Sequence, residues 1–357
     1  MSPDGWQTWP RASSKPGRNY QHKQRTATPK TMSSPLLTLA TSAEHRSRIE
    51  EALRESVNSN IPHLTAVASH LIGAGGKRLR PMLAVCAAQI TQDGPVSREA
   101  ILGAVTCELV HMGSLYHDDV MDEALTRRGV ATANSLWGNS QAVVAGDFLL
   151  ARASEIAASL GSTVARLCAR TIGDLCEGQT QELVTMYDPG RSIESYETSI
   201  RGKTAALFAT CANMGATVTG YDKLLREAVS RIGEAYGMVF QIVDDVLDVV
   251  STDKDLGKPA GHDMQAGVYT LPVLLTLAET GPGPDKLRDL LSRRMTDQEA
   301  KEALEIVRGG RGVSGALAHA YKFVRLAEEQ AESLPETRAS EALKRAPRML
   351  LESSSLG

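Results

Sequence analysis

The fold is decided by two segments, LVHMGSLYHDDVMD at residues 109–122 and MVFQIVDDVLD at residues 238–248. Each segment has a helical pattern of apolar residues and contains two adjacent aspartates, with a third aspartate four positions after the first. Because positions i and i+4 share one face of a helix about 6 Å apart, the first and last carboxylates of each cluster project together. These pairs are Asp118 with Asp122 and Asp244 with Asp248.

Carboxylates within an apolar helix indicate a metal site. They are costly there unless they are paired or bind a cation, and oxygen-only ligands favour a hard cation, Mg²⁺ before Ca²⁺. One such cluster alone would fit an N-cap or a solvated helix face equally well, but two clusters of identical spacing in apolar surroundings favour the metal. Mg²⁺ that is held by few carboxylates completes its shell with substrate phosphates. If the two helices face each other, they form a Mg²⁺-lined cavity that binds a diphosphate.

The composition favours a protein built from packed helices. The chain has 357 residues and a formal charge of −3, and 42% of its residues are hydrophobic but only 4% aromatic, whereas β-sandwiches favour aromatic and β-branched residues. The near-neutral charge gives no case for nucleic acid. No apolar run is long enough to span a membrane, and five cysteines without a CxxC motif favour a reducing, cytoplasmic setting. We therefore predict one all-α domain of ten or more helices.

The N-terminal segment differs from the rest of the chain. Residues 1–34 contain six basic residues against the single acid Asp4 and have no apolar period. Such a segment cannot bury enough surface to offset the entropy of ordering, so we predict a disordered extension over residues 1–38 and one domain over residues 39–357. An upstream start before Met32 and an organelle transit peptide are the alternatives for this extension.

Short turn signals separate the expected helices. DGP at residues 93–95 and DPG at residues 188–190 are two of these breaks. Thr296 with Glu299 predicts a capping box at the start of a late helix. The GxGxxG pattern that begins at Gly310 is predicted to be a turn between helices, because a dinucleotide fingerprint needs a preceding strand.

Basic and polar groups accompany both aspartate clusters. The motif GGKRLRP at residues 75–81 is a glycine turn followed by three basic side chains, and an arginine pair follows the first cluster. Taken singly, each such group has an ordinary explanation as a turn, a solvated cation or a core histidine. Their joint placement instead favours the binding of a diphosphate, since arginine binds phosphate bidentately. The groups are Lys77, Arg80, His111, Arg127, Arg128, Lys203, Thr204, Gln241 and Lys258.

These motifs resemble the trans-isoprenyl (polyprenyl) diphosphate synthase family, of the long-chain type, over about residues 45–345. The matching stretches are GGKRLRP at 75–81, HDDVMDEALTRRG at 117–129, GKT at 202–204, FQIVDDVLD at 240–248 and GKPAGHD at 257–263. The resemblance implies the isoprenoid synthase fold, which is an all-α bundle around a deep central cavity, and a homodimer. It also implies a prenyltransferase that takes isopentenyl diphosphate and an allylic diphosphate, with about two or three Mg²⁺ ions in each active site.

The resemblance also implies a role for each position. The metal ligands would be Asp118, Asp122, Asp244 and Asp248, with Asp119 in support. Isopentenyl diphosphate would be held by Lys77, Arg80, His111 and Arg128. The allylic diphosphate would lie near Arg127, Lys203, Thr204, Gln241 and Lys258. Stabilisation of the departing diphosphate would make the following residues catalytic: Asp118, Asp119, Asp122, Lys203, Asp244 and Lys258.

Small side chains one turn before the first cluster favour a long product. In short-chain relatives, bulky aromatic residues near these positions stop elongation, whereas Gly113 and Ser114 leave room for a tail. Descending the helix to Val105 covers about 20 Å, which admits several isoprene units. We therefore predict a medium-to-long all-trans product of the kind used as a quinone side chain. The alternatives are a farnesyl or geranylgeranyl diphosphate synthase, a non-catalytic subunit of a heteromeric synthase, and a Gly113 that serves only helix packing.

Overall fold

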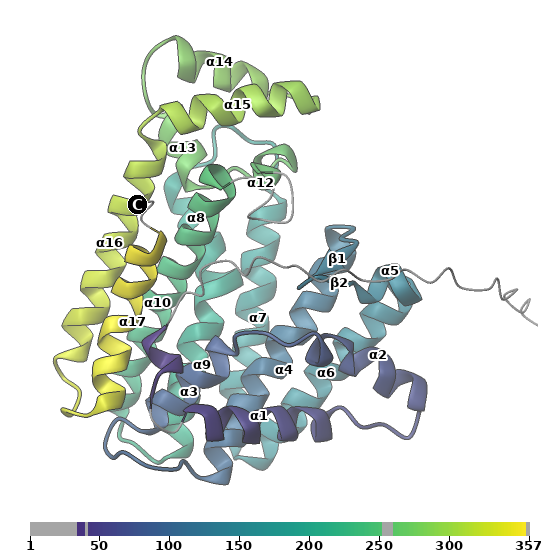
Figure 1. Cartoon of the computed structure of the whole chain (residues 1–357), viewed down its shortest axis with the longest axis vertical. Helices are drawn as coiled ribbons and strands as arrows, with labels where there is room; N and C mark the ends of the chain where they lie inside the picture. Colours follow the sequence, from purple (N-terminus) through teal and green to yellow (C-terminus); the bar gives the residue numbers. More distant parts are fainter. Residues whose placement is uncertain (1–33, 40–41, 252–259, 355–357) are drawn as a thin grey trace, which may run out of the picture. The chain divides into compact units, whose positions relative to one another are not determined.

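The computed structural model describes residues 34–39, 42–251 and 260–354, all of which belong to the larger of two units, Met32–Gly357. This unit is almost entirely helical, which confirms the predicted all-α class (Figure 1). None of the helices in the described ranges is long and apolar enough to cross a membrane. The elements in chain order are η1 (Pro35–Leu37), α1 (Ser42–Ser56), α2 (Pro62–Gly73), α3 (Leu79–Ala88), α4 (Arg98–Met121), β1 (Thr126–Arg127), β2 (Val130–Ala131), α5 (Ala133–Trp137), α6 (Asn139–Ser159), α7 (Ser162–Leu183), α8 (Ile193–Ile200), η2 (Arg201–Ala205), α9 (Ala206–Val218), α10 (Lys223–Val250), α12 (His262–Gln265), α13 (Leu271–Leu277), α14 (Pro282–Leu291), α15 (Asp297–Gly309), α16 (Gly312–Ala331) and α17 (Arg338–Ser354).

Helices α4 and α10 organise the bundle and carry the two aspartate clusters. α4 packs against α3, α6 and α9, and α10 packs against α9, α16 and α17. Most of α4 is buried, so its apolar residues surround the helix and do not form a single stripe. Both helices begin with a side-chain cap: the Ser97 hydroxyl accepts the amide hydrogen of Ala100, and the Asp222 carboxylate accepts that of Leu225. The two clusters lie at the C-terminal ends of these central helices.

The predicted turn signals coincide with helix boundaries. Residues 93–95 lie between α3 and α4, and residues 188–190 lie between α7 and α8. Thr296 and Glu299 form both hydrogen bonds of a capping box at the start of α15, which confirms that prediction. The GxGxxG pattern lies at the junction of α15 and α16, so it is a connection between helices, as predicted.

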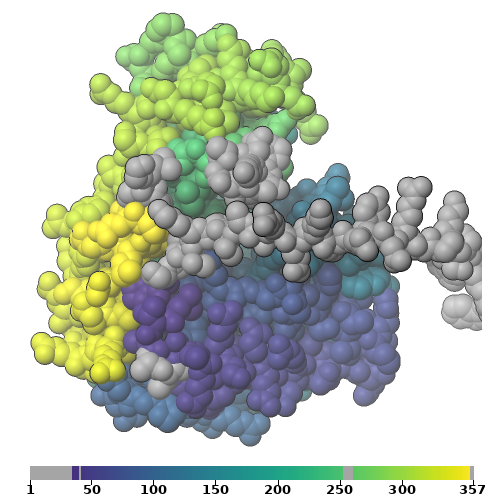
Figure 2. Space-filling view, in the orientation of Figure 1, coloured from purple at the N-terminus to yellow at the C-terminus, as the bar shows by residue number. Residues whose placement is uncertain are grey.

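The packed part of the chain begins before the predicted boundary at residue 39. Pro35–Leu37 form a short 3₁₀ turn, and the Leu36 side chain is fully buried. This turn packs against α3 and α17, so the purple N-terminal residues lie beside the yellow C-terminal helix (Figure 2). Residues 34–38 therefore pack on the domain, whereas residues 1–33 of the predicted extension lie outside the described residues.

Candidate active site

One pocket of about 520 Å³ is lined by basic side chains from three separate segments of the sequence, namely Lys77, Arg78, Arg80, His111 and Arg128. Lys77 precedes α3, Arg80 and His111 lie on α3 and α4, and Arg128 lies between β1 and β2. Asp244 of the second aspartate cluster lines the same pocket. Apolar side chains complete its wall, namely Phe240, Val243 and Leu247 of α10 and Leu350 of α17. The structure thus brings together the four residues that the resemblance links to isopentenyl diphosphate.

The pocket holds more positive charge than its own carboxylates neutralise. Burial, reinforced by the charges of Arg80 and Arg128, holds the pKa of His111 well below its ordinary value of 6.5, so this imidazole is neutral at pH 7. The Arg80 guanidinium lies 4.3 Å from the centre of the Phe208 ring, and its Nη1 is 3.3 Å from Nε2 of His111. Its buried Nε has no hydrogen-bond partner among the described residues. Such a set of underpaired cations suits an anion.

The other arginine of the motif at residues 75–81 has a different role. Arg78 is buried with a left-handed backbone conformation, φ +53°. Its Nε donates to Glu50 Oε1 at 2.7 Å and its Nη1 donates to Glu108 Oε1 at 2.8 Å. These two bonds join the turn before α3 to α1 and α4. Arg78 therefore holds the turn in place, and Lys77 beside it is exposed.

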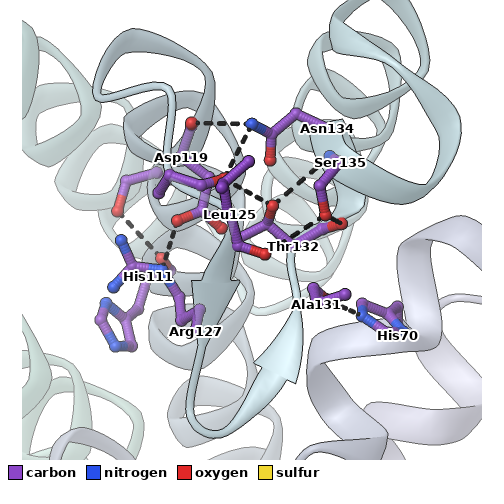
Figure 3. A network of polar contacts seen from close by, with 11 residues as sticks. His70, His111, Asp119, Leu125, Arg127, Ala131, Thr132, Asn134 and Ser135 are labelled. Atoms are coloured by element: carbon purple, nitrogen blue, oxygen red, sulfur yellow. Dashed lines mark hydrogen bonds and ion pairs between the residues drawn. The ribbon is translucent and has the colours of Figure 1, made fainter. Parts of the chain in front are cut away.

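A short hairpin that the sequence analysis did not predict carries the arginine pair (Figure 3). Arg128 and Gly129 at its tip have φ values of +54° and +77°, the signs that a two-residue type I′ turn requires. Arg127 turns toward α4, where its Nε donates to Asp119 Oδ1 at 2.6 Å. The Asn134 amide donates to the Asp119 carbonyl at 3.0 Å. The hairpin thus delivers Arg128 to the basic pocket and Arg127 to the first aspartate cluster.

The first cluster keeps the predicted arrangement on α4. Asp122 is the C-cap, and its amide donates to the Asp118 carbonyl at 2.8 Å, so the two side chains share a face as predicted. Burial raises the pKa of Asp118 to about 6, while the nearby Lys203 opposes the rise and the charge of Asp122 adds to it. Burial also raises the pKa of Asp122. Two carboxylates that share one partly desolvated face attract a cation.

Lys203 and Thr204 lie in a π-helical turn, η2, between α8 and α9. This turn approaches α7 closely: a Cβ on Gly178 would lie 2.2 Å from the Lys203 backbone nitrogen. The Lys203 ammonium donates to Glu182 Oε1 at 2.5 Å. Burial disfavours the charged form of Lys203, but Glu182, Asp118 and their neighbours outweigh it and raise its pKa. The wide turn therefore sets a charged lysine near the first cluster, as π-turns often do at functional sites.

The second cluster divides into one exposed and two buried carboxylates. Asp244 is exposed at the pocket, whereas Asp245 is buried and accepts hydrogen bonds from Tyr196 and Gln241. Asp248 Oδ2 accepts the amide hydrogen of Asp263 at 3.3 Å. The charge of Asp263 contributes to raising the pKa of both Asp122 and Asp245. One carboxylate thus lies within electrostatic reach of both clusters.

The structure does not support the predicted roles of two residues, Lys258 and Gly113. Lys258 lies outside the described residues. A Cβ on Gly113 would lie 3.0 Å from Leu150 and 3.1 Å from the Gly146 carbonyl, so Gly113 allows α4 and α6 to pack closely. This is the packing role that was open as an alternative. Ser114 is half-buried, and its hydroxyl donates to the His111 carbonyl at 2.9 Å.

Known proteins resemble this chain over most of their length. The family model described as polyprenyl synthetase matches residues 61–307. The chain belongs to the polyprenyl synthetase family. It is accordingly a prenyltransferase, a polyprenyl diphosphate synthase of the medium-to-long-chain, all-trans type.

Three members of this family illustrate the match. Nonaprenyl diphosphate synthase from Mycobacterium tuberculosis is 39% identical over 77% of this chain and 82% of that protein. Heptaprenyl diphosphate synthase from Staphylococcus aureus superposes with a TM-score of 0.81 and 31% identity, over 87% of this chain and 98% of that one. Geranylgeranyl pyrophosphate synthase from Corynebacterium glutamicum, complexed with calcium and isoprenyl diphosphate, gives 0.77 and 36%, over 88% and 96%. These matches confirm the predicted family and its all-α fold.

The structure adds partners to the polyprenyl synthetase motifs that sequence reasoning missed. Glu182 pairs with Lys203, and Tyr196 pairs with Asp245. Glu50 and Glu108 pair with Arg78. Each of these residues is a single acid or tyrosine in an ordinary helical pattern, so no local signal marks it. Only the packing of distant helices brings them to the site.

Proposed function

We propose that the chain condenses isopentenyl diphosphate head to tail with an allylic diphosphate, in the presence of Mg²⁺, to give a medium-to-long all-trans polyprenyl diphosphate. One observation carries the proposal: the basic pocket and a carboxylate of the second aspartate cluster share one wall. Transfer between two diphosphate esters needs a basic site for one ester and a carboxylate site for the metal-bound other. A pocket of either kind alone would suit a simpler reaction.

The carboxylates fit a hard divalent cation. Within the described ranges, no three His, Cys, Asp or Glu side chains gather closely enough to form a metal site by themselves, and Mg²⁺ commonly binds to one or two carboxylates with substrate phosphates completing its shell. Asp118 and Asp122 would hold Mg²⁺ on one side, and Asp244 with Asp248 on the other. Bound Mg²⁺ would neutralise charge on the departing diphosphate. The calcium and isoprenyl diphosphate named for the Corynebacterium glutamicum enzyme support this assignment.

The chain's own residues supply binding and charge. Lys77, Arg80 and Arg128 hold the diphosphate of isopentenyl diphosphate, and the apolar wall around Phe240 keeps its double bond away from water. The cationic Lys203 stabilises the diphosphate that leaves the allylic substrate. The double bond attacks the allylic carbon as the carbon–oxygen bond breaks, and the released pyrophosphate takes the proton. The reaction needs no protein nucleophile.

The proposed product length depends on the part of α4 that precedes the first aspartate cluster. Ser114 is small and lies one turn before Asp118, so a growing tail meets no aromatic side chain at that position. The nonaprenyl and heptaprenyl names of two relatives support a long product. The geranylgeranyl name of the third keeps a shorter product as the second candidate.

A homodimer is part of the proposal. Helix α7 has 22 residues, yet its buried residues are only Val164, Cys168, Thr171 and Gly178. Large apolar side chains remain exposed on the neighbouring α5, α6 and α7, namely Leu136, Val143, Val144 and Leu183. A second copy of the chain would cover such a surface.

One incubation tests the proposed function. The full chain with Mg²⁺, isopentenyl diphosphate and a series of allylic primers should yield prenyl diphosphates, whose masses give the product length. The variant Asp118→Asn/Asp122→Asn should lose at least about a hundredfold in kcat, because the metal-bearing carboxylates become neutral. Its helical circular dichroism should match that of the parent chain. No product with any primer, or full activity in the variant, would contradict the proposal.

A further inference from the structure

A buried series of hydrogen bonds connects Tyr196 on α8 to Thr204 in η2 through two residues of α10. The Tyr196 hydroxyl donates to Asp245 Oδ2 at 2.5 Å, and Gln241 Nε2 donates to Asp245 Oδ1 at 2.9 Å. The Thr204 hydroxyl donates to Gln241 Oε1 at 2.7 Å. Tyr196 is 1% exposed and Asp245 is 2% exposed. The proposed reaction assigns no step to Tyr196.

The donor and acceptor groups fix the direction of each hydrogen bond in this series. The Gln241 side chain presents its NH₂ to Asp245 and its carbonyl oxygen to Thr204, the orientation that satisfies both neighbours. The Thr204 hydroxyl then points its hydrogen at Gln241 and leaves its lone pairs for other partners. Both oxygens of Asp245 accept hydrogen bonds in the core, and Asp244 next to it is exposed at the pocket. The second aspartate of this cluster therefore orients its neighbours.

We infer that Tyr196 is a positioning residue for the allylic-diphosphate half of the site. It holds Asp245, which orients Gln241, which in turn orients Thr204. The inference rests on the proposed function, because Thr204 and Gln241 affect turnover only if the allylic diphosphate binds beside them. The basic pocket receives its cations from the turn before α3, from α3 itself and from the hairpin, so the binding of the other substrate should not change.

Tyr196→Phe tests the inference by removing one oxygen atom. The ring stays, and with it the stacking on Arg191, whose guanidinium carbon is 5.7 Å from the ring centre. The KM for farnesyl diphosphate should rise about tenfold to hundredfold, the loss expected for a hydrogen bond to a charged group. The KM for isopentenyl diphosphate should change by less than about twofold on the same argument. Calorimetry with pyrophosphate and Mg²⁺ gives a readout that needs no turnover, and its Kd should weaken in parallel.

A matched tyrosine separates positioning from general damage. Tyr269 is also 1% exposed, and its hydroxyl donates to the Leu291 carbonyl at 2.7 Å. Tyr269→Phe removes an equally buried hydrogen bond away from Asp245 and should leave both KM values unchanged. Circular dichroism and thermal melts of both variants report folding. If both substrates lose affinity equally in Tyr196→Phe, Tyr196 is merely structural and the inference is wrong.

A double variant tests whether Tyr196 acts through Asp245. If Tyr196 acts through Asp245, adding Tyr196→Phe to Asp245→Asn should raise the KM for farnesyl diphosphate by much less than it does in the parent chain. Fully multiplicative effects would show that Tyr196 acts independently of Asp245 and would overturn the inference. Prenyl transfer by the unaltered chain is measured in the same assay. Its absence would count against the proposed function, whereas a normal parent with an unaffected Tyr196→Phe would count against this inference alone.

Discussion

At the residue scale, the arginines of the basic pocket differ in how far their charges are paired within the protein. Arg78 is the satisfied member, since Glu50 and Glu108 hold it. Arg80 contacts the Phe208 ring and His111, neither of which carries a negative charge. Burial therefore lowers the pKa of both Arg80 and His111. A diphosphate would supply the counter-charge that the fold withholds.

The depressed pKa of His111 predicts a pH-dependent stability. An unfolded chain binds a proton at this imidazole below about pH 6.5, but the folded chain does not until the pH falls well below that value. Acidification therefore favours unfolding, and stability rises with pH through this range. At about pH 5.5 the penalty should be about 1 kcal/mol. His111→Gln should remove it, so the loss of unfolding free energy between about pH 7.5 and about pH 5.5 should be smaller than in the parent chain.

Urea titrations at both pH values measure this difference. His63→Gln is the control, because His63 is an exposed histidine on α2 and should leave the pH dependence unchanged. An identical pH dependence in His111→Gln and the parent chain would contradict the prediction.

Ser114 and Gly113 are two candidates for setting the product length, and two substitutions distinguish them. Ser114→Phe places an aromatic ring one turn below Asp118 and should shorten the product, which mass spectrometry of the prenyl diphosphates measures. Gly113→Ala should instead cost about 1–3 kcal/mol of stability by crowding Leu150, with the product length unchanged. A full-length product from a folded Ser114→Phe variant would refute the role of Ser114. A shortened product from Gly113→Ala would restore the predicted role of Gly113.

At the element scale, the sequence predicted the features that depend only on residues close together in the chain. The aspartates at i and i+4, the capping box at Thr296 and the helical connection at Gly310 depend on neighbours within one or two turns, and the structure has all three. The hairpin was missed because its tip is Arg128–Gly129 in place of the usual Asn–Gly or Asp–Gly. The π-turn was missed because one extra residue in a helical turn leaves almost no trace in an apolar period.

The contact between α7 and η2 predicts a strong effect of one methyl group. Gly178→Ala would place a Cβ 2.2 Å from the Lys203 backbone nitrogen, and backbone on both sides cannot yield as a side chain does. The variant should lose about 1–3 kcal/mol of unfolding free energy. Displacement of Lys203 and Thr204 by about 1 Å should also lower kcat/KM for the allylic substrate by about a hundredfold.

The same helix offers a matched control. Gly173 lies on α7, and a Cβ added to it would meet no other atom of the described residues within 4 Å. Gly173→Ala should therefore stabilise the helix by up to about 1 kcal/mol and leave kinetics unchanged. Equal behaviour of the two variants in melts and steady-state assays would show that the α7–η2 contact does not position the site.

At the scale of the whole molecule, the site is assembled from segments that the sequence separates widely. Lys77, Arg128 and Asp244 meet at one pocket only because α3, the hairpin and α10 converge there. The resemblance to a known family identified these motifs in the sequence. The ion pairs that fix the motifs to the helical bundle depend on how the helices are aligned along one another. Arg78 with Glu108 and Lys203 with Glu182 are such pairs. This alignment depends on contacts between residues that are distant in the sequence, so sequence patterns alone did not predict it.

The oligomeric state is also a property of the whole molecule, and exposed apolar side chains on α5 and α6 predict a dimer. Val144 on α6 is 54% exposed and Leu136 on α5 is 50% exposed, and these helices adjoin one another. Val144→Glu places a charge where a second copy would exclude water, so it should shift the mass measured by sedimentation from dimer to monomer. Leu224→Glu is the control, because Leu224 is 77% exposed near the start of α10 and carries the same change without touching α5 to α7. A parent chain that sediments as a monomer, or a Val144→Glu variant that stays dimeric, would remove α6 from the interface.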